Sequence, residues 1–419
     1  MSSSRLSILD VFNRYRYAGG EEYSAERIRK HLAQRHDVSV CQFQSQEWAN
    51  PDGPKPISQA WRLFYNPEGR QRFESAIDQN QADVAIFHNI YPVGSPALYH
   101  VAQKRHLPVI QFLHNYRPFA VGGTLYSRGR ILPDSLHGSY LREVREGAWM
   151  GSVARSALMA LNLKMLHRSG WLKSVSTWIA ISDFMRQRLI EAGAVDPDRI
   201  VTLRHAWDLM PEAPPRQDAG FYLFLGRLVG EKGIPTLLDA WDIVHAKLGK
   251  KTPSMHIAGD GPLSSLIIER AKTNPYLCLL GNIGGETKAE QLTRCRAVIV
   301  PSNWWEPLGL VTYEAYDYAK PVLAARAGGL NETVLSGVTG LTHEPGNAAE
   351  LARDVLAIEA MSPAARDTFG AGGRSWLRRE ADAATWLRRF EAIARNAIDR
   401  TQEEARQADP LNFAARTAA

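Results

Sequence analysis

The stretch that decides the fold is residues 297–316, which read "AVIVPSNWWEPLGLVTYEAY". Four apolar residues open it, and proline, serine and asparagine follow, so the pattern predicts a buried strand that ends in a loop. A helix can begin near Gly309 and must end before Pro321, because the residue before a proline is disfavoured in the helical conformation. A strand, a loop and a helix in this order form the repeating unit of a parallel sheet covered by helices.

The same alternation of apolar strand and amphipathic helix runs through the chain and divides it into two halves. The strand candidates of the first half are residues 5–13, 37–43, 83–89, 107–115, 176–182 and 199–206. Those of the second half are residues 221–227, 254–261, 276–282, 297–302, 321–326 and 339–344. We therefore expect an α/β protein with two Rossmann-like, doubly wound domains and a cleft between them.

A shift in composition marks the boundary between the halves. The segment "DLMPEAPPRQDAG", residues 208–220, has the proline and polar content of a linker. We expect a first domain at residues 1–207, a second domain at residues 221–375, and C-terminal helices at residues 376–419 that pack back toward the first domain.

The overall composition is that of a globular protein, with 45% hydrophobic and 22% charged residues in a chain of 419. Its three cysteines, Cys41, Cys278 and Cys295, lie far apart and show neither a disulfide nor a zinc spacing. The N-terminus lacks the pattern of a secretory signal, and no stretch has the apolar length of a spanning helix. These features predict a cytoplasmic protein that does not span a membrane.

Charge is unevenly distributed along the chain. Residues 1–205 carry 26 Lys and Arg against 18 Asp and Glu, whereas the remainder carries 24 against 26. The basic half predicts an acidic partner, such as phospholipid headgroups or a phosphorylated lipid. Nucleic acid is not expected as a partner, because there is no basic run interleaved with aromatics and no zinc-finger spacing.

Two glutamates flank the predicted start of the helix in residues 297–316. Ligands of doubly wound folds bind at the carboxyl ends of the strands, and the free amides of Gly309 and Leu310 would seat an anion there. Glu314 lies about 7.5 Å further along the helix, and its side chain leans back toward that seat, where it can accept hydrogen bonds from a diol such as ribose. Glu306 would lie on the other side of the phosphate. The order of these groups, with Glu314 for a diol, the amides for a pyrophosphate and Glu306 beside the group that the phosphate carries, suits a nucleotide diphospho-sugar.

With seven residues between them around "EPLGL", Glu306 and Glu314 resemble the paired-glutamate motif of the retaining glycosyltransferases of family 4, also called group 1. Four other segments agree with that family: "AISDFMRQRL" at 180–189, "LGRLVGEKGI" at 225–234, "IAGDGP" at 257–262 and "AGGLNETV" at 327–334. The resemblance covers nearly the whole chain. It implies the two-domain architecture called GT-B, with the nucleotide-sugar donor bound mainly by the second domain and the acceptor mainly by the first.

The resemblance also assigns cationic partners to the donor phosphates. Arg227 and Lys232 follow a predicted strand and would bind the pyrophosphate in place of a metal ion. The only literal Asp-x-Asp, formed by Asp196 and Asp198, surrounds Pro197 and predicts a surface turn rather than a Mg²⁺ or Mn²⁺ site. We therefore expect no metal and no cofactor, with the nucleotide-sugar as substrate.

Residues of the first half complete the expected site. His114 occupies the family position that contacts the donor sugar, but many relatives read His-Asp where this chain has Asn115, which weakens any role for an adjacent carboxylate in tuning the histidine. Gly19 and Gly20 either supply turn conformations with positive φ or, as the resemblance implies, face the pyrophosphate and the sugar. Glu332 is expected to be a first-turn helix acid rather than a catalytic group.

The implied reaction is transfer of a hexose from a nucleotide donor to an acceptor hydroxyl with retention at the anomeric carbon. The catalytic residues would be His114, Glu306, Arg227 and Lys232. The donor-binding set would be Gly19, Gly20, Arg227, Lys232, Glu306, Gly309, Leu310 and Glu314. Three alternatives stay open: a non-hydrolysing sugar-nucleotide epimerase, a metal-dependent transferase, and a catalytically silent partner subunit.

A basic helical stretch at residues 139–173 bears on the acceptor. Its apolar residues are ordinary core in one interpretation. In the other, the cations and the tryptophans lie on an anionic bilayer, because only Glu143 and Glu146 offset the six cations. The cations are Arg142, Arg145, Arg155, Lys164, Arg168 and Lys173, and the apolar residues are Trp149, Met150, Leu158, Met159, Leu163, Met165, Leu166 and Trp171. We expect peripheral association with the inner face of the cell membrane and a glycan or polyprenyl-phosphate-linked glycan as acceptor, in polysaccharide or glycolipid biosynthesis.

Overall fold

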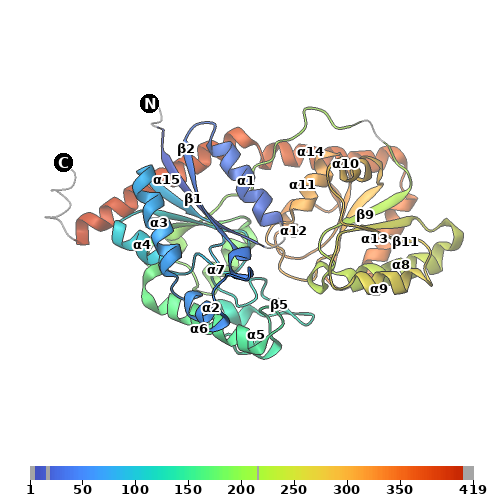
Figure 1. Cartoon of the computed structure of the whole chain (residues 1–419). Coiled ribbons are helices and arrows are strands. Elements are labelled where there is room, and N and C mark those ends of the chain that lie inside the picture. The colour runs from blue at the N-terminus through green and yellow to red at the C-terminus, as the bar shows by residue number, and fades with distance from the viewer. Residues whose placement is uncertain (1–4, 16–18, 215–216, 409–419) are drawn as a thin grey trace.

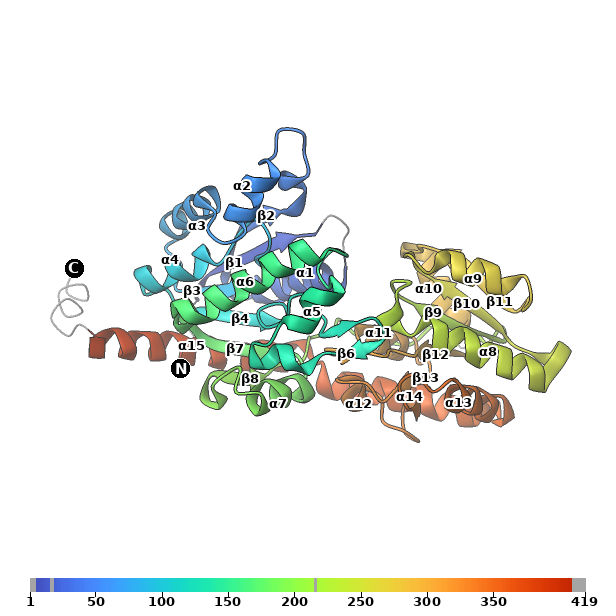
Figure 2. The ribbon, with the colours of Figure 1, turned by 90° about the horizontal axis from the view of Figure 1, so that it is seen from below.

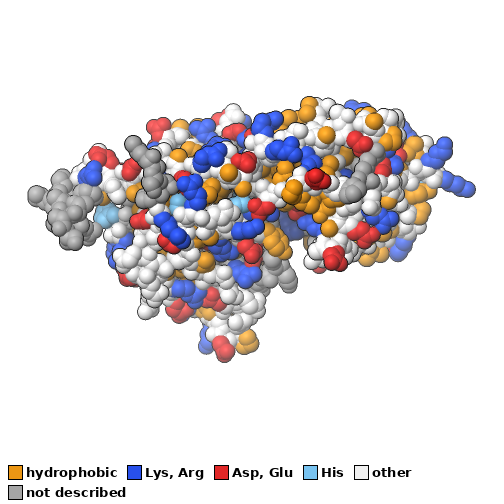
Figure 3. Space-filling view, turned by 90° about the horizontal axis from the view of Figure 1, so that it is seen from above, with side chains coloured by type: hydrophobic (Ala, Val, Ile, Leu, Met, Phe, Trp, Pro, Cys, Tyr) orange, Lys and Arg blue, Asp and Glu red, His pale blue; other side chains and the backbone are white. Residues whose placement is uncertain are grey.

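The computed structural model describes residues 5–15, 19–214 and 217–408, and it confirms the predicted α/β architecture (Figure 1). Two six-stranded parallel sheets, each covered by helices, form two domains, and all twelve predicted strands are found in them. The space-filling surface is hollowed between the two domains (Figure 3). Predictions that touch residues 1–4, 16–18, 215–216 and 409–419, including parts of the linker and of the C-terminal segment, lie outside the described residues.

The first sheet has the strand order β2-β1-β3-β4-β7-β8. Its strands are β1 (Ser7–Arg14), β2 (Asp37–Gln44), β3 (Val84–Phe87), β4 (Val109–Leu113), β7 (Val175–Ala180) and β8 (Ile200–Thr202). Helices cover both faces, so β3, β4 and β7 are buried along their whole length and their sequences are apolar runs with few polar interruptions.

The second sheet has the strand order β11-β10-β9-β12-β13-β14. Its strands are β9 (Phe221–Leu225), β10 (Ser254–Ala258), β11 (Leu277–Gly281), β12 (Ala297–Val300), β13 (Val322–Ala325) and β14 (Gly340–His343). In both sheets the strand order reverses next to the first strand of the domain, which is where ligands of doubly wound folds bind.

The helices follow the amphipathic stretches between these strands. Those before the linker are α1 (Gly20–Leu32), α2 (Pro56–Arg62), α3 (Pro67–Asn80), α4 (Ala97–Arg105), α5 (Leu141–Glu146), α6 (Val153–Ser169) and α7 (Asp183–Glu191). Those after it are α8 (Ile234–Leu248), α9 (Ser264–Ala271), α10 (Gly285–Arg294), α11 (Leu310–Asp317), α12 (Leu330–Thr333), α13 (Ala348–Ala360), α14 (Pro363–Glu380) and α15 (Ala383–Ala408). Within the described residues, no helix has both the length and the apolar character that crossing a membrane requires.

The last two helices belong to different domains. Helix α14 packs on α11 and β14 of the second domain, whereas α15 returns to the first domain and packs on β4, β7 and α1 (Figure 1). The ring of Trp386 on α15 stacks on Phe112 of β4. The boundary that we placed between residues 375 and 376 falls inside α14, so the chain crosses back only after Glu380.

The predicted helical stretch at residues 139–173 is interrupted. Helix α5 ends at Gly147, whose φ of +67° is the left-handed conformation that closes a helix. Helix α6 begins after Ser152, whose side chain accepts a hydrogen bond from the amide of Arg155. A short antiparallel hairpin, β5 (Tyr126–Ser127) and β6 (Arg130–Ile131), was not among the expected elements and extends toward the second domain (Figure 2).

Candidate active site

The predicted site residues follow the carboxyl ends of neighbouring strands in both domains. Arg227 follows β9 and Glu306 follows β12, which pairs with β9. In the first domain, His114 follows β4 directly. The two edges meet: the rings of Phe184 on α7 and Trp305 lie 5.4 Å apart across the domain boundary.

Glu306 is the most heavily bonded residue of the predicted set. Both of its carboxylate oxygens accept from Lys232 Nζ, at 2.9 and 2.8 Å, and Oε2 also accepts from Ser302 Oγ and Trp304 Nε1. The ammonium of Lys232 lies 5.2 Å from the centre of the Trp304 ring. A buried carboxylate that is paired with a cation and hydrogen-bonded by two further donors is held in one orientation.

The loops that carry Lys232 and Glu306 are pressed together. Gly233 has a φ of +75°, and a Cβ there would lie 1.8 Å from the carbonyl oxygen of Pro301, so only glycine fits. The amide of Asn303 donates to the carbonyl of Glu231 at 2.8 Å. The sequence "EKG" therefore brings Lys232 to the glutamate across 74 positions of chain.

Helix α11 begins as the predicted anion seat requires. Gly309 at its N-cap has a φ of +83°, and among the described residues the amides of Gly309 and Leu310 donate to no backbone carbonyl, whereas that of Thr312 donates to the carbonyl of Gly309 at 2.9 Å. Five residues along, Glu314 Oε1 pairs with Lys288 Nζ of α10 at 2.7 Å. Burial lowers the pKa of Arg27 on α1, while the charges of Asp208 and Glu314 act in the opposite direction. Because Glu314 influences Arg27, this cation of the first domain lies near the second glutamate of the motif.

Arg227 is held less tightly than Lys232. Its guanidinium pairs only loosely with Glu231, at 3.2 Å, and its side chain is 61% exposed. An exposed cation at the end of a strand can swing toward a ligand at little cost.

Gly19 and Gly20, the two predicted site residues at the start of α1, do not adopt the left-handed backbone conformation. Gly19 is the N-cap of α1 with a φ of −136°, and Gly20 is the first residue of that helix. A Cβ on either would meet no atom within 4 Å. Of the two alternatives, the turn with positive φ does not hold for Gly19, and with respect to the described residues both glycines leave open space beside the start of α1.

His114 lies at the end of a buried chain of polar groups. Its Nε2 is 2.7 Å from His88 Nδ1, and His88 Nε2 is 3.0 Å from Asp10 Oδ2. The ring of His205 stacks on His114 with centroids 5.1 Å apart. Burial lowers the pKa of His114 well below its usual value, and His88 and His205 add to the effect, so the imidazole is neutral.

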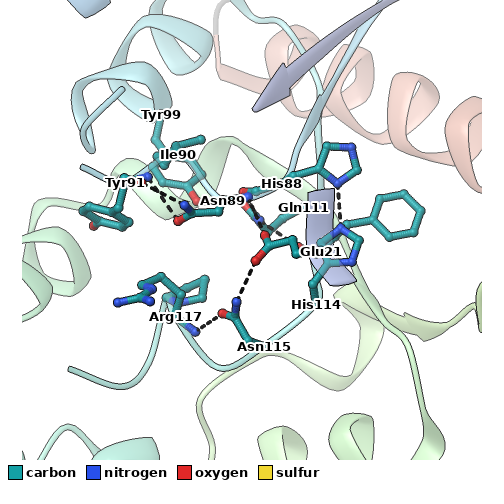
Figure 4. A pocket seen from close by; sticks show the side chains of 12 residues that line it. Glu21, His88, Asn89, Ile90, Tyr91, Tyr99, Gln111, His114, Asn115 and Arg117 are labelled. Carbon is teal, nitrogen blue, oxygen red and sulfur yellow. Dashed lines mark hydrogen bonds between the residues drawn. The ribbon is translucent and has the colours of Figure 1, made fainter. Parts of the chain in front are cut away.

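Sequence reasoning missed Glu21, the first-turn residue of α1 that lines the pocket in Figure 4. Its Oε2 accepts from Tyr15 at 2.7 Å and from Asn115 Nδ2 at 2.9 Å, and its Oε1 accepts from the amide of Asn89. Burial raises the pKa of this carboxyl, although its donors act in the opposite direction. Nothing in "GGEEY" distinguishes Glu21 from Glu22, because its partners come from the ends of three different strands.

Two further predictions concern residues outside the cleft. Asp196 accepts from the amide of Asp198 at 2.9 Å within a single 3-10 turn, as the surface-turn interpretation expects. Glu332 lies in the first turn of α12, as expected, and it also accepts from the amides of Asp183 and Phe184 at the start of α7. Glu332 thus caps a helix of the other domain.

Comparison with protein families identifies the chain. Residues 18–209 match the model described as Glycosyltransferase Family 4, and residues 206–376 match the model described as Glycosyl transferases group 1. The chain therefore belongs to the family 4, or group 1, glycosyltransferases, as the motifs predicted.

Curated relatives match only part of the chain. An uncharacterized glycosyltransferase of Methanocaldococcus jannaschii is 30% identical over 164 residues, which is 39% of this chain and 44% of the relative. A glycogen synthase of Mycobacterium tuberculosis is 32% identical over 149 residues, which is 34% of this chain and 35% of the relative. These matches thus span less than half of either relative's length.

Solved structures agree over nearly the full length. HepE of Anabaena in complex with UDP-glucose superposes with a TM-score of 0.65 at 18% identity, covering 93% of this chain and 99% of the other. Sucrose-phosphate synthase of Thermosynechococcus elongatus gives a TM-score of 0.67 at 17% identity, covering 93% and 98%. At these identities the likeness shows the fold, which is GT-B.

Proposed function

We propose that this protein is a retaining glycosyltransferase that moves a hexose from a nucleotide diphospho-sugar to a hydroxyl of a glycan or lipid-linked glycan. The observation that carries the proposal is the bidentate pair of Lys232 and Glu306 at the carboxyl edge of the second sheet. Burial raises the pKa of Tyr116, and Glu306 adds to the effect, so the pair lies close to the wall of the first domain. A sugar bound between them would touch both domains.

The donor phosphates would bind where positive charge is concentrated. In this proposal Lys232, Arg227 and the amides of Gly309 and Leu310 would contact the phosphates near the start of α11, where the helix dipole also favours an anion. Glu314 would accept hydrogen bonds from the ribose. HepE was solved in complex with UDP and with UDP-glucose, which supports the same class of donor here.

Retention follows in this proposal from a front-face displacement. The bond between the anomeric carbon and the phosphate oxygen breaks, and the acceptor oxygen forms its bond on the same face. The acceptor proton goes to the departing phosphate oxygen. Lys232 and the amides of α11 would stabilise the charge on that phosphate, while Glu306 and His114 would orient the sugar, and no metal ion takes part.

Three measurements test the proposal. UDP-, GDP- and ADP-sugars are screened by thermal shift, where a ligand at 100 times its Kd should stabilise the fold by about 2.7 kcal/mol. Proton NMR of the first product should show the anomeric configuration of the donor, and turnover should survive EDTA. An inverted product or metal dependence would contradict the mechanism, and sugar release or epimerisation without an acceptor would indicate an epimerase.

We further propose that the acceptor is lipid-linked and that the first domain lies on an anionic membrane. The core interpretation of residues 139–173 holds for Met159, Leu163 and Leu166, which are buried, while Trp149 and Trp171 pack on the same core. Leu161 and Met165 on α6 remain exposed beside Lys164 and Arg168, and α6 itself contains no acidic residue.

Helix α2 adds an apolar edge that the sequence did not suggest. Its Ile57 is 90% exposed and its Trp61 is 67% exposed. Asn162 of α6 donates to the carbonyl of Leu63 just after α2, so the two helices are neighbours, and both lie at the lower end of the first domain in Figure 1. A tryptophan and an isoleucine among cations suit the interface of an anionic bilayer.

Sedimentation with vesicles tests the membrane proposal. Wild-type protein should bind phosphatidylglycerol vesicles more strongly than phosphatidylcholine vesicles, and high salt should weaken the binding. The variants I57S/W61S and K164E/R168E should each lose most of it. The control I268S/V338S removes two exposed apolar residues of the second domain and should sediment like wild type. Equal binding by all variants would make a water-borne glycan the better acceptor.

A further inference from the structure

Three buried polar residues in the first domain form a continuous chain that ends at His114. Asp10 lies in β1, His88 follows β3 and His114 follows β4, three strands that are neighbours in the sheet. Asp10 is fully buried and His88 nearly so. The contacts are Asp10 Oδ2 to His88 Nε2 at 3.0 Å and His88 Nδ1 to His114 Nε2 at 2.7 Å.

The chain permits one placement of protons when the imidazoles are neutral. A carboxylate can only accept, so His88 Nε2 carries the hydrogen, and the Arg29 guanidinium lies 3.6 Å from the other carboxylate oxygen, Asp10 Oδ1. A neutral imidazole has one N–H, so His88 Nδ1 is bare and accepts from His114 Nε2. His114 therefore keeps a bare Nδ1.

That nitrogen is the open end of the chain on the His114 side, whereas at the other end Asp10 Oδ1 also lacks a hydrogen bond within the described part of the protein but lies 3.6 Å from the Arg29 guanidinium. Among the described residues, His114 Nδ1 finds no hydrogen-bond partner although it is buried. Buried polar atoms are nearly always paired, so an orphan acceptor at the edge of a cleft implies a missing donor.

We propose that Asp10 and His88 are positioning residues that fix His114 as the Nε2–H tautomer, so that His114 Nδ1 accepts a hydrogen bond from a hydroxyl of the bound sugar. The inference rests on the proposed function for the identity of the ligand, but the tautomer itself does not. It also accounts for Asn115: the carboxylate that orients His114 comes from Asp10 through His88, rather than from the next residue in the chain.

Nitrogen-15 NMR of the ligand-free protein tests the tautomer directly. Long-range proton–nitrogen correlations of histidine-labelled protein distinguish a protonated from a bare ring nitrogen, and the spectrum of H114Q identifies the signals of His114. We expect a protonated Nε2 and a bare Nδ1 for His114 at pH 7. A protonated Nδ1 would overturn the proposal whether or not the protein transfers sugars.

Binding measurements test the positioning role. In D10A, His114 should show a mixture of tautomers, and the affinity for the matching glucose nucleotide among UDP-, GDP- and ADP-glucose should fall about 10-fold, as expected for one lost hydrogen bond. Affinity for the nucleoside diphosphate alone should not change, which also shows that the site is folded. If D10A does not fold, the tautomer of His114 in the spectrum of the wild-type protein still tests the proposal.

A matched control separates this role from general stability. Asp354 is a buried aspartate 3.5 Å from the buried His343 in the second domain, away from His114. D354A should leave both the tautomer of His114 and the ratio of sugar-nucleotide to nucleotide affinity unchanged. Equal losses of sugar-nucleotide affinity in D10A and D354A would reduce Asp10 to a structural residue and overturn the proposal.

Discussion

At the scale of single residues, the two cations of the proposed donor site are held differently, and their variants should differ accordingly. The side chain of Lys232 is 22% exposed and pairs with buried Glu306, whereas Arg227, whose side chain is 61% exposed, pairs with Glu231. We expect K232A and R227A each to lower turnover by about 10²-fold, because the charge on the leaving phosphate is largest in the transition state. Only K232A should also lower the free energy of unfolding, by about 1 to 3 kcal/mol, because it leaves the Glu306 carboxylate unpaired.

Steady-state kinetics and urea unfolding of both variants check this prediction. E314A serves as the comparison, since it should weaken nucleotide-sugar binding more than turnover. Wild-type turnover in all three variants would contradict the assignment of this edge of the sheet as the donor site.

His205 provides a pH-dependent test of the buried histidine stack. Burial lowers its pKa to about 3, and Arg27 and His88 add to the effect. Between about pH 6.5 and pH 3 the unfolded chain binds a proton at His205 that the folded chain does not bind. This contribution to the free energy of unfolding is therefore fully present above pH 6.5 and is lost as the pH is lowered toward 3. H205Q should reduce the slope by up to about 1.4 kcal/mol per pH unit. H137Q, at an exposed histidine, should not change it.

At the scale of elements, the start of α11 depends on a glycine. A Cβ at Gly309 would lie 2.4 Å from Leu330 Cδ2, in addition to the strain of φ at +83°. G309A should therefore lower the free energy of unfolding by about 2 to 3 kcal/mol and weaken nucleotide binding, because the amides of the first turn shift. Gly281, with a φ of +70° and no atom within 4 Å of its Cβ position, is the matched control. G281A should cost only about 1 to 2 kcal/mol and leave binding unchanged.

The elements themselves were largely predictable, and the contacts between them were not. Buried parallel strands show as short apolar runs, so all twelve strands were found from the sequence, whereas the two-residue strands β5 and β6 leave no such pattern. The motif also named Glu306, Glu314 and Lys232, and the structure brings Lys232 into contact with Glu306. Glu21, Asp10 and His88 were not predicted, because hydrogen bonds between residues 68 to 94 positions apart depend on which strands lie side by side.

At the scale of the whole molecule, one segment of the second domain joins the donor loop to the domain boundary. The amide of Gly329 donates to the carbonyl of Glu306 at 2.7 Å, and three residues later Glu332 reaches the first domain. Glu332 caps α7 and pairs with Arg204 at 2.7 Å. The short helix α12 and the residue before it therefore contact both the Glu306 loop and the first domain, and no local pattern in "GGLNETV" predicts this double contact.

Removing that link should loosen the molecule without unfolding either domain. E332A loses a charged helix cap and an ion pair across the boundary, interactions worth about 1 to 3 kcal/mol together. We expect a larger radius of gyration in small-angle X-ray scattering and weaker binding of the nucleotide-sugar, with affinity for the nucleoside diphosphate largely retained, because the second domain supplies most of the proposed nucleotide contacts. E344A removes an exposed glutamate that pairs with Arg326 within the second domain and should behave like wild type. If E332A and E344A scatter and bind alike, the boundary is held by the packing of Trp305 and Phe184 and not by Glu332.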